Sequence, residues 1–131
     1  GNVYGCGGND SKQLTNKYKP LISKIIDDSN IIKIGCCERT SILLTNKHEL
    51  KIFGKNVDAS SSNIIKIKKV TQSNVISFDC GYSHFGYITD DNKLYMSGRN
   101  YNYECGIDVR KYCSSQEYTH NNNDNIIDVK C

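Results

Sequence analysis

Cysteine and histidine are the side chains of this chain best suited to hold a metal ion or act as nucleophiles, and both are scattered. The seven cysteines are odd in number and include no Cys-x-x-Cys pair, which argues against a closed disulfide framework and a zinc site. Free cysteines pack as small hydrophobes and indicate a reducing compartment, the cytosol or nucleus. His48, His84 and His120 are far apart, and none belongs to a metal-binding motif.

Three short segments imitate catalytic motifs without completing them. Gly5-Cys6-Gly7-Gly8 is glycine-rich but lacks the Lys-Ser/Thr of a phosphate-binding loop. Gly81-Tyr82-Ser83-His84 lacks the second glycine of a serine nucleophile elbow. Asp90-Asp91 is typical of a turn. We therefore expect no enzyme activity, no catalytic residue, no cofactor and no metal.

Composition indicates a globular chain of modest charge. Hydrophobic residues make up 37% and charged residues 24% of the 131 residues, with a net charge of +3. The densest basic run, Lys66, Lys68 and Lys69, alternates with apolar residues like a strand with a solvated face, so direct nucleic-acid binding is not expected. No stretch approaches the roughly 20 apolar residues of a membrane-spanning helix.

A repeat of about 45 residues organises the chain. Segments beginning at Val3, Leu50 and Leu94 share a glycine and an asparagine in register. The recurring residues are Gly7, Gly54 and Gly98, and then Asn9, Asn56 and Asn100. Glycine inside a strand pattern indicates close backbone approach, and the asparagine is expected to cap a turn or take a left-handed conformation.

A second signature alternates apolar and polar residues and ends in cysteine. Its copies end at Cys36, Cys80 and Cys131, which we interpret as equivalent packing residues. Hairpins are predicted across 46–49 and 90–92, with weaker strands at 22–26 and 64–70. About four strands in each repeat predict an all-β chain of four-stranded antiparallel propeller blades. We place the blade junctions near 47–50 and 92–94, within one repeat region spanning 1–131.

These residues resemble RCC1 (regulator of chromosome condensation 1) repeats. Cys6-Gly7-Gly8-Asn9, Phe53-Gly54-Lys55-Asn56 and Ser97-Gly98-Arg99-Asn100 are similar to the Trp-Gly-x-Asn core of that family, and Gly81-Tyr82-Ser83-His84 to its Gly-x-x-His. The resemblance implies a partial β-propeller of about two and a half blades, a fragment of a seven-bladed ring. Gly81 and His84 would be structural, and the end blades would need further chain or a partner to cover them.

Tyrosine and arginine gather in one expected loop. Its candidate partner-binding residues are Arg99, Tyr101, Tyr103, Arg110 and Tyr112. These residue types are enriched at interface hot spots, although the tyrosines could instead pack within the blade. We expect a scaffold that binds a protein partner without catalysis. Two alternatives implied by the resemblance are guanine-nucleotide exchange on a Ran-like small GTPase with chromatin association, and an accessory repeat region of a ubiquitin ligase or kinase.

Overall fold

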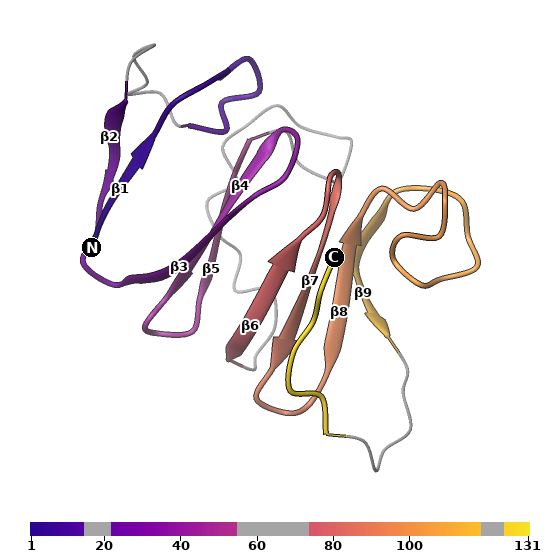
Figure 1. Ribbon diagram of the computed structural model, residues 1–131. Coiled ribbons are helices and arrows are strands. Elements are labelled where there is room, and N and C mark those ends of the chain that lie inside the picture. Colours follow the sequence, from indigo (N-terminus) through magenta and orange to yellow (C-terminus); the bar gives the residue numbers. More distant parts are fainter. Residues whose placement is uncertain (15–21, 55–73, 119–124) are drawn as a thin grey trace.

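The computed structural model describes residues 1–14, 22–54, 74–118 and 125–131, and these residues form strands, turns and irregular segments (Figure 1). The predicted strand at 64–70 with its lysines, Asn56 and His120 lie outside the described residues. The strands are β1 (Asn2–Gly5), β2 (Ser23–Asp27), β3 (Ile31–Cys36), β4 (Thr40–Thr45), β5 (Leu50–Gly54), β6 (Val75–Cys80), β7 (His84–Thr89), β8 (Leu94–Gly98) and β9 (Cys113–Tyr118).

The strands form three antiparallel sheets that follow one another along the chain. β6-β7-β8-β9 is a four-stranded meander, β3-β4-β5 has three described strands, and β1-β2 has two. The all-β prediction is confirmed. Hairpins form where turn residues separate β-rich runs, and His48 and Asn92 supply the left-handed residue of the β4–β5 and β7–β8 turns, with φ of 62° in each.

The blade junctions differ from the prediction. Residues 46–49 and 90–93 are hairpin turns inside a sheet, whereas the chain changes sheet between β2 and β3 and again between β5 and β6. The sequence repeat begins in the middle of a blade because its most recognisable glycine lies at the end of the third strand. The repeat and the blade therefore have the same period but different starting points.

The main core lies between the second and third sheets. Its buried side chains from β4 and β5 are Ile42, Leu44 and Leu50, and those from β6 and β7 are Val75, Phe78, Phe85 and Tyr87. A second cluster, formed by Ile88, Met96, Cys105, Cys113 and Val129, joins the other face of the third sheet to the C-terminal segment. Apolar burial of this kind stabilises each blade through its neighbours.

The first and second sheets pack less closely than the second and third. The predicted packing role of Cys36 is therefore wrong. Phe78 and Cys80 fill the space beside Gly35, where an added Cβ would lie 2.6 Å from the Phe78 ring and 2.7 Å from the Cys80 Sγ. The equivalent residues Ile34 and Cys36, which face the first sheet, are exposed.

The C-terminal segment, 125–131, is not a strand, although its alternation resembles that of β3 and β6. It lies along β6, where Ser77 Oγ donates to Asp128 Oδ1 (3.2 Å) and the Cys131 N–H donates to Asp79 Oδ2 (2.9 Å). Val129 is buried, whereas Cys131 is exposed, so the packing role predicted for Cys131 is also wrong. No strand in the described part of the chain pairs with this segment. Its alternating pattern therefore buries Val129 without backbone pairing to a neighbouring strand.

Candidate partner-binding loop

The loop between β8 and β9 is organised by Asn100, which is fully buried. Its Nδ2 donates to the carbonyl oxygens of Ile107 (2.9 Å) and Val109 (2.7 Å), and its Oδ1 accepts from the Cys105 N–H (2.7 Å). One amide thus satisfies three backbone groups that the loop would otherwise leave unpaired. The loop therefore has a defined conformation without regular secondary structure.

The first repeat contains the same cap. Asn9 Oδ1 accepts from the Leu14 N–H (2.8 Å), which repeats the Asn100–Cys105 bond five residues along the chain. The left-handed residues are Lys12 (φ 59°) and Tyr103 (φ 64°), so each asparagine acts as a cap and the residue three positions later takes the positive φ. Sequence repetition had located both asparagines, but it could not show which backbone groups they bond.

Aromatic side chains and one arginine lie at the surface of this loop. Tyr101, Tyr103 and Tyr112 are 47%, 46% and 45% exposed, so they do not pack inside the blade. Tyr101 and Tyr112 meet edge to face with ring centroids 5.7 Å apart. Arg110 stacks over Tyr103 at 5.0 Å, and its Nε donates to the Tyr103 hydroxyl (3.1 Å). Each ring therefore holds a neighbour in place while keeping an open face.

Arg99 and Glu104 form the inner, charged part of the loop. Arg99 lies 5.9 Å from the Tyr101 ring centroid, and its Nε is 3.7 Å from Glu104 Oε1. Burial by itself would raise the pKa of Glu104, but hydrogen bonds from the backbone N–H groups of Glu104 and Asn102 and from the Asn102 side chain outweigh it and lower that pKa. The negative charge of Glu104 thus offsets the positive charge of Arg99. Among the candidate residues, Arg110 is the exposed cation.

The recurring glycines share one backbone conformation but have different surroundings. Gly7, Gly54 and Gly98 have φ of 101°, 115° and 127°. An added Cβ would lie 2.1 Å from the Arg39 carbonyl oxygen at Gly54 and 2.4 Å from the His84 Cα at Gly98, and it would meet nothing within 4 Å at Gly7. Gly54 and Gly98 are each paired with a residue of the adjacent strand, Thr40 and His84, whereas Gly7 lies beyond the end of β1.

His84 and Gly81 belong to the turn before β7. The Gly81 N–H donates to the His84 carbonyl (2.9 Å), and an added Cβ at Gly81 would lie 2.3 Å from the His84 ring. The imidazole therefore covers the glycine, and a larger residue at position 81 would displace it. This arrangement is a packing contact.

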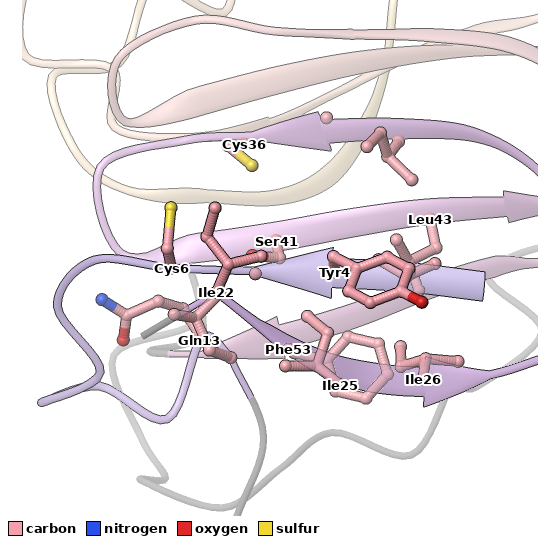
Figure 2. A pocket seen from close by; sticks show the side chains of 15 residues that line it. Tyr4, Cys6, Gln13, Ile22, Ile25, Ile26, Cys36, Ser41, Leu43 and Phe53 are labelled. Carbon is pink, nitrogen blue, oxygen red and sulfur yellow. The ribbon is translucent and has the colours of Figure 1, made fainter. Parts of the chain in front are cut away.

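An apolar cleft of about 390 Å³ lies between the first two sheets (Figure 2). Its lining includes Leu14, Ile25, Ile34, Cys36, Leu43 and Phe53. Sequence reasoning missed it, because the strand pattern shows which residues are apolar but not how closely two sheets approach each other.

The His, Cys, Asp and Glu side chains of the described residues are dispersed. Within them, no group of three His, Cys, Asp or Glu side chains is arranged to hold a metal ion. All seven cysteines are free. A search of the same residues finds no helix of the length and apolarity that crossing a bilayer requires.

Successive antiparallel sheets, of which the third packs its first strand against the second, define the chain as part of a β-propeller. Residues 75–104, which span β6 to β8 and the start of the loop, match the Regulator of chromosome condensation (RCC1) repeat.

Relatives and solved structures agree with this assignment. An RCC1 repeat-containing protein of Dictyostelium discoideum is 26% identical over 99 residues, covering 68% of this chain and 20% of that protein. Human WBSCR16 superposes with a TM-score of 0.74 at 15% identity, covering 99% of this chain and 38% of its own. Prp20p of Saccharomyces cerevisiae, described with its binding to Gsp1p and histones, gives 0.68 at 16% identity, covering 100% and 37%. The chain thus spans less than two fifths of each of these proteins.

Proposed function

We propose that the chain is a non-catalytic scaffold that binds a protein partner through the loop between β8 and β9. The observation that carries the proposal is the Asn100 cap, because it fixes a loop whose tyrosines are half-exposed on a rigid sheet. Aromatic side chains held in place lose little conformational entropy on binding, which is why such residues dominate interfaces.

The chemistry of the loop favours a polar surface on the partner with apolar patches. Tyr101 and Tyr112 offer ring faces, and Arg110, stacked on Tyr103, presents a guanidinium that is already oriented. An oriented guanidinium suits a carboxylate or backbone carbonyl acceptor, because its N–H groups form a planar fork. The proposed contact set is therefore Tyr101, Tyr103, Arg110 and Tyr112, with Arg99 supporting Tyr101 from within.

The test is affinity purification of the tagged chain from its own cells, followed by mass spectrometry. A Tyr101→Ala/Arg110→Ala double variant is compared with wild type and with Tyr82→Ala, which removes a 67%-exposed tyrosine outside the loop. We expect at least one protein to be recovered with wild type and Tyr82→Ala and lost with the double variant. Recovery of the same proteins by all three would reject this surface, provided that their melting curves coincide.

A second candidate, regulation of a small GTPase, is favoured by the likeness to Prp20p, which is described as binding Gsp1p and histones. Its test is the rate of guanine-nucleotide release from a Ran-like GTPase with and without the chain. Acceleration would support exchange, whereas an unchanged rate would leave the scaffold proposal ahead. An accessory role beside a ubiquitin ligase or kinase, the cytosolic or nuclear location and the covering of the end blades stay predictions.

A further inference from the structure

Two thiols from neighbouring sheets meet where the second and third sheets pack. Cys37 follows β3 and Cys80 ends β6, and both are half-buried against the main core. The Cys37 Sγ donates to the His84 carbonyl oxygen (3.6 Å), which also accepts from the N–H of Gly81, the residue after Cys80 (2.9 Å). The Cys80 Sγ is turned toward β3, 2.7 Å from where a Cβ added at Gly35 would lie, so the two thiols approach each other from different blades at a site that is partly open to solvent.

The repeat explains how this pair arises. Position 37 is equivalent to position 81, since the Cys37 N–H donates to the Thr40 carbonyl (2.8 Å) as the Gly81 N–H donates to the His84 carbonyl (2.9 Å). The RCC1-like pattern has glycine at this position, and Gly81 keeps it. Cys37 replaces that glycine and places a second thiol against the cysteine that recurs in register. The Cys37 thiol therefore departs from the repeat pattern, whereas the Cys80 thiol belongs to it.

We propose that Cys37 and Cys80 form a site of reversible oxidation, at which a hydroperoxide converts the two thiols into a disulfide joining adjacent blades. The Cys80 S–H donates to Cys37, and this hydrogen bond outweighs burial and nearby Asp79 to lower the pKa of Cys37. The same hydrogen bond raises the pKa of Cys80. Cys37 is thus the nucleophile and Cys80 the resolving thiol.

The reaction balances with hydrogen peroxide. The Cys37 thiolate attacks one peroxide oxygen, the O–O bond breaks, and the departing hydroxide takes up the proton that Cys37 released, which gives a sulfenic acid and water. The Cys80 sulfur then attacks the sulfenic sulfur. The S–S bond forms as the S–O bond breaks, and a second water leaves with the Cys80 proton. Two thiols are oxidised, one peroxide is reduced, and a dithiol reductant reverses the step by exchange.

A second pair of cysteines in the chain tests whether oxidation depends on solvent access to the thiols. Cys105 and Cys113 also lie in one cluster, donating to the carbonyls of the adjacent residues Arg99 (3.5 Å) and Gly98 (3.4 Å), but they are buried at 1% and 4% exposure within the third blade and its loop. Oxidation that depends only on two thiols being close would link both pairs. Oxidation that also requires solvent access and a favoured thiolate would link Cys37 to Cys80 first.

The experiment treats the reduced chain with hydrogen peroxide, blocks the remaining thiols by alkylation in denaturant, and maps the peptides by mass spectrometry. We expect a peptide pair joined between Cys37 and Cys80, with Cys105 and Cys113 alkylated, and a melting temperature that rises on oxidation and falls back on adding dithiothreitol. Cys37→Gly, which copies Gly81, and Cys37→Ser should each abolish the link and the shift. A Cys80–Cys131 link, a link between Cys105 and Cys113 alone, or oxidation of Cys37 without any link would overturn the proposal.

Discussion

Gly98 lies directly opposite His84 in the β7–β8 ladder, so close that a Cβ added to the glycine would be 2.4 Å from the His84 Cα. The same relationship recurs between Gly54 and Thr40, where the nearest atom is the Arg39 carbonyl oxygen. Strand backbones can approach to this distance only where one residue has no side chain. The recurring glycine therefore sets how tightly the third strand of each blade closes on the second.

We predict that Gly98→Ala destabilises the chain by about 3 kcal/mol or more, because backbone strain at φ 127° adds to a clash with backbone atoms that cannot move aside. Gly7→Ala has the strain without the clash and should cost only about 1 kcal/mol. Urea unfolding followed by circular dichroism measures both. Equal losses for the two variants would contradict the close approach as the reason for the glycine.

Asn100→Ala should destabilise the chain by roughly 2–4 kcal/mol, since it leaves the carbonyls of Ile107 and Val109 and the N–H of Cys105 without their partner. Asn102→Ala, an exposed change in the same loop, should stay within about 0.5 kcal/mol of wild type. The readout is the urea midpoint, together with limited proteolysis of the loop. A loop as resistant in Asn100→Ala as in wild type would show that the cap is dispensable.

The two junctions between sheets predict different costs at equivalent positions. Phe78→Ala should cost about 3–5 kcal/mol, because the ring is 1% exposed and fills the core beside Gly35. Ile34→Ala should cost less than about 1 kcal/mol, because Ile34 is 58% exposed in the cleft. Comparing the free energies of unfolding tests this directly. A large loss for Ile34→Ala would mean that the first sheet packs more closely than the cleft implies.

Asp28 links the turn between β2 and β3 to β5, and it makes stability depend on pH. A hydrogen bond from Lys51 Nζ (2.6 Å), helped by the Asn30 N–H, lowers the pKa of Asp28 from its ordinary value of 3.8 to about 2. A lowered pKa stabilises the fold above the ordinary value, and the contribution is lost as the pH falls from about 4 towards 2.

Asp28→Asn should therefore lower the melting temperature at pH 7, and its difference from wild type should shrink as the pH approaches 2. Asp27→Asn is the matched control, since the Asp27 carboxylate is 78% exposed and, among the described residues, forms its ion pair with Lys24 on its own strand. Thermal unfolding at a series of pH values gives the comparison. A difference for Asp28→Asn that stays constant between pH 7 and pH 2 would rule out the ion pair as its cause.

The sequence predicted strands and hairpins well, because the signals for them are local. Alternation located β3 and β6, and turn residues located the β4–β5 and β7–β8 hairpins within a residue or two. Burial was predicted less well. Cys36 and Cys80 occupy the same repeat position, yet one is exposed and the other half-buried, because each depends on a facing sheet that its own neighbours in sequence do not specify.

The candidate loop was located by residue type, but its geometry was not. Tyrosine and arginine enrichment identified Tyr101, Tyr103 and Arg110, whereas their pairing depends on which carbonyls Asn100 reaches across the loop. The contact between Cys37 and Cys80 was missed for a related reason. Residues on different blades meet only after the sheets have stacked, and the repeat alignment compared cysteines at equivalent positions instead of cysteines that touch.

The open junction between β1-β2 and β3-β4-β5 has a consequence for how the chain loses its structure. In a linear array each unit is held by its neighbours alone, so opening begins at the weakest contact. The amides of β1 and β2 should therefore exchange with deuterium through a local opening that leaves β4, β7 and β8 protected. The chain would then have two exchange free energies instead of one, with the boundary between them running along the cleft.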